Sequence, residues 1–181
     1  MGEQGGSATT TLVTFKLGKE TFALEISRVR EVLDFSDVTQ VPQTPAFMLG
    51  IINLRGNVVP VVDLRRKLNL QDVERTRDTR VLILEILVDH ERVTLGAVAD
   101  CVREVIELEA GQVSPPPGIG TLVRADFMKS MGRKDGEFIM ILDVDKVFSL
   151  DDIAAVQAAD PAITTVDSVD ANRGTINHRS G

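Results

Sequence analysis

The stretch VREVL at residues 29–33 returns as VREVI at residues 102–106, at an offset of 73. When the comparison is extended at this offset, TFALEISRVREVL (21–33) aligns with TLGAVADCVREVI (94–106). Thr meets Thr at the start, and apolar residues mostly meet apolar residues. A match of this length raises the question of whether the chain holds two copies of one structural unit.

The similarity continues on both sides of these segments. Upstream, LVTFKL (12–17) resembles LILEIL (82–87), if the second hairpin turn is two residues longer. Downstream, at an offset of 80, residues 46–68 align with residues 126–148. Landmarks of this last segment recur in the same order: Phe47-Met48 with Phe127-Met128, Gly56 with Gly136, and Asp63 with Asp143. This order indicates an internal duplication.

Each copy is rich in β-branched residues and in short apolar runs with a period of two, the pattern of half-buried strands. In VREVL the spacing of Val29, Val32 and Leu33 would also suit a helix. The β-branched content and short length favour a strand, with Val29, Glu31 and Leu33 on one side. Each copy is therefore expected to contain a hairpin, a third strand, a proline-containing connection with a helical turn, and a closing hairpin.

Local signals add detail to the first closing hairpin. AFMLG (46–50) is expected to form one helical turn that ends at Gly50. RGN (55–57) is expected to supply a tight Gly-Asn hairpin turn. Pro60 has no N–H to donate to a neighbouring strand, so its strand is expected at a sheet edge or with a bulge there.

About five strands per copy, closed on themselves, would bury one face and remove most exposed edges. The sequence thus predicts an all-β fold of two five-stranded β-barrel subdomains, related by internal duplication, with short helical turns and an apolar seam between them. The folded part is expected at 11–155, with the intertwined subdomains divided near 70–80. Residues 1–10 and 156–181 are expected to be disordered tails, because neither holds a sustained apolar pattern.

Composition and residue types exclude several functions. A net charge of −7, with no Trp and no Tyr, disfavours nucleic-acid binding, which usually needs a basic face and stacking aromatics. One cysteine, Cys101, and two histidines form no metal-site pattern, and no cofactor motif is present. Asp63 and Asp143 each follow an apolar strand and precede a possible short helix, so helix capping is favoured over acid–base catalysis. An enzyme is not expected.

No secretory signal opens the chain, and the apolar run VLILEILV (81–88) is too short to cross a bilayer. A soluble, cytoplasmic protein is expected. The locally basic stretch RRKLNLQDVERTRDTR (65–80) has two interpretations, a solvated loop or a docking surface for an acidic partner.

The segment TPAFMLGIINLRGNVVPVVDLR (44–65) resembles the signature segment of CheW-type chemotaxis coupling proteins, as do residues 21–33 and 95–105. The resemblance extends over residues 11–155. It implies two SH3-like barrels and a non-enzymatic adaptor that joins the cytoplasmic tip of a chemoreceptor (a methyl-accepting chemotaxis protein) to the regulatory domain of the histidine kinase CheA. It further implies a monomer that assembles with these partners into membrane-associated receptor arrays, without a cofactor.

The resemblance also implies a receptor-binding surface. Its expected members are the NLRG residues, an acidic residue of the third strand and three apolar groove residues: Asn53, Leu54, Arg55, Gly56, Glu31, Ile26, Val29 and Val98. Physically, an arginine beside a hairpin tip can fork onto a partner's carboxylate, or it can stabilise its own turn through Glu31; the two roles are compatible. The second copy has Glu104 in place of Glu31, but its hairpin reads GRKDG, without the NLRG context of the arginine.

Two alternatives stay open. One is an adaptor of the same fold in another receptor–kinase pathway, such as surface motility. The other is a pair of barrels that binds a small ligand or an oligonucleotide, which the acidic charge and scarce aromatic residues oppose.

Overall fold

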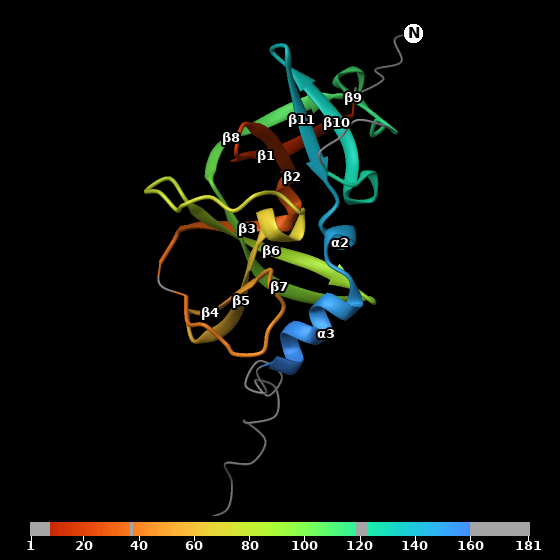
Figure 1. The fold of residues 1–181 in the computed structure, drawn as a ribbon. Coiled ribbons are helices and arrows are strands. Elements are labelled where there is room, and N and C mark those ends of the chain that lie inside the picture. Colours follow the sequence, from red (N-terminus) through yellow and green to blue (C-terminus); the bar gives the residue numbers. More distant parts are fainter. Residues whose placement is uncertain (1–7, 37, 119–122, 160–181) are drawn as a thin grey trace, which may run out of the picture.

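The computed structural model describes residues 8–36, 38–118 and 123–159 of the 181-residue chain (Figure 1). Most of the two expected tails, residues 1–7 and 160–181, lies outside the described residues. Thr9 already belongs to the first strand, and the last helix continues to Ala159 and buries Val156. The folded part therefore extends beyond the expected 11–155 at both ends.

The described strands form two sheets, one above the other in Figure 1. Sheet A has the order β8 (Cys101–Glu109), β1 (Thr9–Leu17), β2 (Glu20–Glu25), β11 (Glu137–Leu142), β10 (Met128–Lys134), β9 (Val113–Ser114). Sheet B has the order β3 (Val29–Asp34), β6 (Arg80–Val88), β7 (Glu91–Ala99), β5 (Asn57–Asp63), β4 (Met48–Leu54). The all-β prediction is confirmed: each sheet has five main strands, and the two-residue β9 adds to sheet A.

Short helical elements connect the strands. They are the 3-10 turns η1 (Ile26–Arg28), η2 (Ala110–Gln112) and η3 (Ala125–Phe127), and the helices α1 (Leu64–Lys67), α2 (Val144–Val147) and α3 (Leu150–Ala159). Asp63 Oδ1 accepts a hydrogen bond from Arg65 N at 2.9 Å, and Asp143 Oδ1 accepts one from Asp145 N at 3.1 Å. The expectation that both aspartates cap helices is confirmed. None of the described helices is both long enough and apolar enough to cross a membrane.

Each sheet contains strands from both sequence copies. The hairpin β1–β2 of the first copy lies between β8 and β11 of the second, and the hairpin β6–β7 of the second copy lies between β3 and β5 of the first. The expectation that five strands of one copy close on themselves is therefore wrong, because the copies exchange their first hairpins. A boundary near 70–80 separates the sequence copies without separating the sheets.

The strand register repeats as the duplication predicts. In the parallel pairs that join the copies, Val61 lies opposite Gly96 and Ile141 lies opposite Ala23. Val61 and Ile141 are 80 residues apart, and Ala23 and Gly96 are 73 apart, which are the two offsets of the sequence alignment. The two offsets were found separately in the sequence, and both are needed to relate the Val61–Gly96 pair to the Ile141–Ala23 pair.

One part of the alignment is out by one residue. Leu12 pairs with Ile106, and Val81 pairs with Leu33, which is the counterpart of Ile106. Leu12 therefore corresponds to Val81 and not to Leu82. The error matters because a shift of one residue moves a side chain to the other face of a strand.

The strand β3 forms where VREVL predicted it, and Val29, Glu31 and Leu33 share its partly buried side. Pro60 lies in an interior strand, since β5 has β7 and β4 on its two sides. The parallel pairing with β7 begins only at Val61, so the missing N–H of Pro60 leaves no partner unsatisfied there. The expected edge position was wrong, and the bulge in the β4–β5 pair lies in β4 between Met48 and Gly50, opposite Val62 and Val61 and not at Pro60.

Two turns also differ from expectation. The β4–β5 turn consists of Arg55 (φ 52°) and Gly56 (φ 86°), one residue earlier than expected; two positive φ angles define a type I′ turn. Gly50 ends no helical turn but lies inside β4 with φ 150°. A Cβ built on Gly50 would stand 2.1 Å from the carbonyl oxygen of Thr39, because Thr39 and Ile51 exchange backbone hydrogen bonds of 2.9 Å beside it.

The largest apolar cluster joins the two sheets. It contains residues of both first hairpins, among them Phe15, Phe22, Leu84 and Leu95, and the rings of Phe15 and Phe22 stack at 5.9 Å. The interiors of the two barrels hold much smaller clusters. The predicted apolar seam is confirmed, and it is the main core, because the exchanged hairpins are buried on both faces.

Helix α3 is held on this core by apolar and charged contacts. Its side chains Ile153 and Val156 are buried, and Lys67 Nζ lies 2.7 Å from Asp152 Oδ2. The same ammonium group lies 5.1 Å from the ring of Phe47 and 5.9 Å from that of Phe127, the matched phenylalanines of the two copies. Lys67 therefore contacts both copies and the C-terminal helix at once.

Candidate partner-binding site at the mouth of one barrel

The hairpin tip of β4–β5 closes onto β3 at one end of the sheet B barrel. Arg55 Nη2 donates to Glu31 Oε2 at 2.6 Å, and Asn53 Oδ1 accepts a hydrogen bond from Gly56 N at 2.8 Å. The ion pair between Arg55 and Glu31, expected from the sequence, is confirmed. Because β3 and β4 are the two outer strands of the sheet, this pair helps to join its edges into a barrel.

Arg55 is 73% exposed at its side chain, whereas Glu31 is 25% exposed. The hydrogen bond and the negative charge of Glu31 raise the pKa of the Arg55 guanidinium. Glu31 Oε1 is buried and has no hydrogen-bond partner among the described residues. The carboxylate thus binds the guanidinium from the barrel side, and the remaining N–H donors of Arg55 are exposed to solvent.

A hollow of about 380 Å³ lies beneath this pair, and we name it the B mouth. It is lined by Arg30, Glu31, Leu54, Arg55, Asn57, Val58, Val59, Ile83 and Thr94. Val59 and Ile83 belong to the apolar interior of the barrel. The B mouth therefore combines an apolar floor with a charged rim, a composition typical of recognition sites.

The other expected site residues lie in three places. Asn53, Leu54 and Gly56 share the hairpin of Arg55. Ile26 is exposed in η1, and Val29 is half-buried at the start of β3, where the chain passes from sheet A to sheet B.

Val98 is not brought together with these residues. It is buried inside the sheet B barrel and lies opposite Asp63 at the end of β5. Asp63 is six residues beyond the start of β5, which places Val98 roughly 20 Å from the tip of Arg55. Its side chain is therefore closed to a partner that contacts Arg55.

Sequence reasoning missed a second ion cluster at the same mouth. Glu85 accepts a hydrogen bond from Arg30 Nε at 2.7 Å and another from Arg30 Nη2, and its other oxygen lies 3.2 Å from Arg92 Nη1. The hydrogen bonds from Arg30, together with the charges of Arg30, Arg92 and Arg28, lower the pKa of Glu85. A signal was present: Glu85 is the one charged residue within the apolar run VLILEILV.

The second copy has the same type of turn but not the arginine–carboxylate pair of the first copy. Asp135 (φ 53°) and Gly136 (φ 77°) repeat the type I′ turn of the first copy, with Asp135 in the place of Arg55. Glu104, the counterpart of Glu31, is exposed. Only the first copy therefore presents an arginine held by a carboxylate on its third strand.

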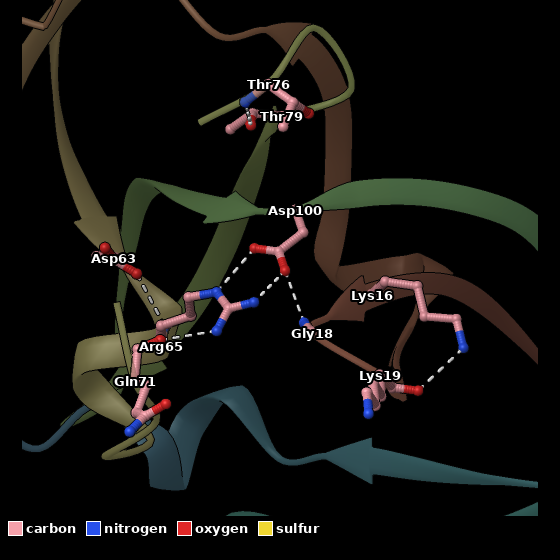
Figure 2. A network of polar contacts seen from close by, with 9 residues as sticks. All are labelled: Lys16, Gly18, Lys19, Asp63, Arg65, Gln71, Thr76, Thr79 and Asp100. Atoms are coloured by element: carbon pink, nitrogen blue, oxygen red, sulfur yellow. Dashed lines mark hydrogen bonds and ion pairs between the residues drawn. The ribbon is translucent and has the colours of Figure 1, made fainter. Parts of the chain in front are cut away.

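Away from the mouth, an ion pair holds the point where the chain crosses from sheet B to sheet A (Figure 2). Asp100 is the single residue between β7 and β8. Its carboxylate accepts hydrogen bonds from Arg65 Nε at 2.8 Å, from Arg65 Nη2, and from Gly18 N at 2.6 Å. Arg65 Nη1 also donates to the carbonyl of Gln71 at 2.7 Å. The buried Arg65 thus links a helix, a loop and both sheets.

The opposite crossover has a matching ion pair with the charges exchanged. Arg28, at the end of η1, donates to Asp145 at 3.2 Å and 2.5 Å, and Asp145 also accepts Leu87 N at 2.8 Å. Asp145 is the counterpart of Arg65 at the offset of 80. Arg28 is one residue away from Ser27, the counterpart of Asp100 at the offset of 73, so the duplication kept one position of the contact and reversed its polarity.

The basic stretch 65–80 largely serves the fold. Arg66 pairs with Asp72 at 3.2 Å, Arg80 pairs with Asp34 at 3.3 Å, and the guanidinium of Arg75 lies 4.3 Å from the ring centre of Phe35. With Arg65 engaged by Asp100, most of these arginines have internal partners. The interpretation as a docking surface for an acidic partner gains no support.

The Arg65–Asp100 pair predicts a specific pH dependence. Burial alone would raise the pKa of Asp100, but the hydrogen bonds from Arg65 and Gly18 and the charge of Arg65 outweigh it, so the pKa lies below its usual 3.8. The stabilisation is therefore present above about pH 4 and is lost as the pH falls through the lowered pKa. In urea titrations from pH 7 to pH 2.5, we expect the free energy of unfolding to fall more steeply below pH 4 for the wild type than for Asp100→Asn. Equal slopes would contradict this role of Asp100.

Fold and site together define a class: a module of two SH3-like barrels, with a charged hollow at the mouth of one of them. Within the described ranges, His, Cys, Asp and Glu form no cluster that could hold a metal ion. Residues 11–152 match the CheW-like domain, and the chain belongs to this family.

Relatives and a solved structure agree with this assignment. The chemotaxis protein CheW of Klebsiella aerogenes is 32% identical over 142 residues, which cover 78% of this chain and 83% of that protein. Protein FrzA of Myxococcus xanthus is 30% identical over 135 residues, or 74% of this chain and 81% of FrzA. The crystal structure of the scaffolding protein TtCheW from Thermoanaerobacter tengcongensis superposes with a TM-score of 0.72 at 30% identity, covering 84% of this chain and 96% of that one.

Proposed function

We propose that this protein is an adaptor of bacterial chemotaxis that couples chemoreceptors to a CheA-type histidine kinase by binding both. The observation that carries the proposal is the match of residues 11–152, which include nearly all strand residues of both sheets, to the CheW-like domain. The relatives named chemotaxis protein CheW and the scaffolding protein TtCheW support it. The adaptor makes and breaks no covalent bond, and it needs no cofactor.

The receptor contact, in this proposal, involves the B mouth and the adjoining crossover. Ile26 and Val29 offer apolar surface where the chain passes between the sheets, and a receptor's helical tip can lie along it with its apolar side. Arg55, oriented by Glu31 at 2.6 Å, offers a guanidinium fork to a carboxylate or carbonyl group of that tip. Asn53, Leu54 and Gly56 shape the turn that presents it.

The kinase contact is assigned to the barrels themselves. Two barrels of equivalent topology give the adaptor two similar surfaces, which suits a regulatory domain built on the same module. The protein is a monomer by itself in this proposal, and it joins cytoplasmic arrays at membrane-associated receptors. Each contact in such an array can be weak, because several linked contacts raise the effective concentration of the next.

The test is co-sedimentation with a receptor cytoplasmic fragment and the kinase. We expect Arg55→Glu to weaken ternary assembly by about tenfold or more, because it places a negative charge next to Glu31 and in front of the receptor. Circular dichroism and the melting curve should stay near those of the wild type. Arg124→Glu is the matched control, since Arg124 has a similar exposure of 72%, pairs with the exposed Asp126 at 2.8 Å and lies 5.2 Å from the ring centre of Phe127, outside the residues that line the B mouth.

Unchanged assembly by Arg55→Glu would remove Arg55 from the contact surface. A loss of folded structure would assign it to barrel closure. If the folded wild-type protein bound neither the receptor fragment nor the kinase, the proposed adaptor function would be wrong.

A second candidate is an adaptor of the same fold in another receptor–kinase pathway. It is kept because one relative of 30% identity over most of its length has a different name, protein FrzA. Deletion of the gene, followed by assays of swimming chemotaxis and of movement on surfaces, distinguishes the two: loss of swimming chemotaxis alone supports the first candidate.

A further inference from the structure

Arg30 and Arg55 line the B mouth, and Arg92 joins the same charge cluster through Glu85 at 3.2 Å; only Arg55 was expected there. We infer that the B mouth binds a helical protein segment through its carboxylates, with Arg30, Arg55 and Arg92 as the anion-binding rim and with Glu85 as the residue that positions two of them. The inference rests on the proposed function only for the identity of the protein that carries the segment. The preference for carboxylates and for an apolar side chain follows from the residues of the B mouth.

The position of Glu85 places the cluster in the mouth. Ile83 and Glu85 are two residues apart on β6, so they lie on the same face, and Ile83 belongs to the barrel interior. Glu85 pairs across the sheet with Thr94, which lines the hollow. Glu85 therefore stands one step outward from the apolar floor, where it holds Arg30 of β3 on one side and Arg92 of β7 on the other.

The charges are arranged in two layers. The carboxylates of Glu31 and Glu85 form the inner layer, and Glu85 is only 19% exposed. The guanidinium groups form the outer layer, with Arg30 at 58% and Arg92 at 78% exposure. Since three guanidinium groups face two carboxylates, the rim is positive in a chain whose net charge is −7. A partner that approaches the B mouth thus meets positive charge first.

The spacing of the rim fits a helix. Arg30 and Arg92 belong to the strands on either side of β6, and both reach the carboxylate of Glu85, at 2.7 Å and 3.2 Å, so their bound nitrogens lie within roughly 8 Å of each other. Four residues of an α-helix span about 6 Å and return to nearly the same face. Carboxylates four residues apart can therefore reach both arginines, while an apolar side chain one turn further along that face enters the hollow over Val59 and Ile83. Nucleic-acid phosphates are a poorer fit, because the inner carboxylates repel a continuous row of them.

The sheet A barrel supplies an internal comparison. Thr21 is the counterpart of Thr94, and Lys16 pairs with Thr21 as Glu85 pairs with Thr94. Lys16 Nζ donates to Glu137 at 3.0 Å, so here the cation is the half-buried partner and the carboxylate is exposed. The layering of charge is reversed in the second mouth. Acidic segments are therefore expected to choose the B mouth alone.

The test uses two synthetic helical peptides of about 16 residues. One carries two Glu residues four positions apart beside an apolar face, and the other carries Gln at both positions. Binding to the full-length protein is measured by fluorescence anisotropy at about 0.02 M and 0.2 M salt. We expect the Glu peptide to bind at least about fivefold more tightly than the Gln peptide at low salt, and much of this preference to disappear at high salt.

Variants locate the effect. Arg30→Gln with Arg92→Gln should abolish the preference for the Glu peptide, and Arg92→Gln alone, at an exposed site that leaves the core untouched, should reduce it. Arg124→Gln, the control, should keep it. Glu85→Gln should leave the fold intact by circular dichroism and lower the preference, because the two guanidinium groups lose their common anchor.

Three results would overturn the inference. They are equal binding of the two peptides, a preference that survives Arg30→Gln with Arg92→Gln, and a single-stranded oligonucleotide that binds through these arginines more tightly than the Glu peptide. The receptor fragment separates this inference from the proposed function. If the receptor fragment binds the wild type and both arginine variants equally, the proposed adaptor function is unaffected and the arginine rim is excluded as the binding site. If the fragment binds none of these proteins while the Glu peptide binds as expected, the result counts against the adaptor function.

Discussion

Arg65→Met is expected to lower the free energy of unfolding by about 2–4 kcal/mol. The substitution leaves the half-buried Asp100 carboxylate without the guanidinium that donates two hydrogen bonds to it. It also removes the donor to the carbonyl of Gln71 at 2.7 Å. Breaking a fully buried pair by removing one partner costs roughly 3–5 kcal/mol, and the partial exposure of Asp100 reduces this figure. Urea denaturation followed by circular dichroism measures the change.

The neighbouring arginine supplies the control. Arg66 is exposed and pairs with the exposed Asp72 at 3.2 Å, so Arg66→Met should cost less than about 1 kcal/mol. The exchanged double variant, Arg65→Asp with Asp100→Arg, copies the polarity of the Arg28–Asp145 pair and should regain part of the loss. Equal costs for Arg65→Met and Arg66→Met would show that Asp100 is satisfied by Gly18 and solvent alone.

Gly50→Ala is expected to cost about 3–5 kcal/mol, from backbone strain of roughly 1–3 kcal/mol and two lost backbone hydrogen bonds of about 1 kcal/mol each. The added Cβ would stand 2.1 Å from the Thr39 carbonyl oxygen, which is backbone and can move only with the chain segment around Thr39. The Thr39–Ile51 bridge that closes the sheet B barrel would then separate. Amide hydrogen exchange at Ile51 and urea denaturation measure both effects.

Gly56→Ala is the control that separates the cost of the Gly50–Thr39 clash from the cost of the backbone conformation. Gly56 also has a positive φ, 86°, but a Cβ there meets no atom within 4 Å. Its cost should be limited to the left-handed conformation, about 1–2 kcal/mol. If Gly50→Ala cost no more than Gly56→Ala, the close approach to Thr39 would not constrain the barrel.

Patterns within one strand or turn were predictable from the sequence. VREVL and VREVI marked a duplication, because equivalent structural positions demand similar side chains and keep their order along the chain. The period of two placed Glu31 on the partly buried side of β3, which is what allowed its pairing with Arg55 to be foreseen. Asp63 and Asp143 were recognisable as caps, since a cap acts on the backbone two residues away.

Contacts between distant segments were not predictable in the same way. Arg30 and Glu85 are 55 residues apart, and Arg65 and Asp100 are 35 apart, and no local pattern selects these partners from the other charged residues. Val98 shows the converse, since an apolar residue in a strand can line a groove or fill a barrel, and only its packing beside Val61 and Val81 places it inside.

The sequence by itself determined two copies of one five-stranded unit, the succession of strands along each copy and the single arginine tip. Tertiary structure alone decided that the copies exchange their first hairpins. The physical reason is that the copies share one register: β2 can pair with the last strand of its own copy or with that of the other through equivalent residues. Exchange buries the hairpins β1–β2 and β6–β7 on both faces and joins Phe15, Phe22, Leu84 and Leu95 into one core. The stabilisation by this core depends on contacts between residues of both copies, so the sequence pattern of either copy alone does not predict it.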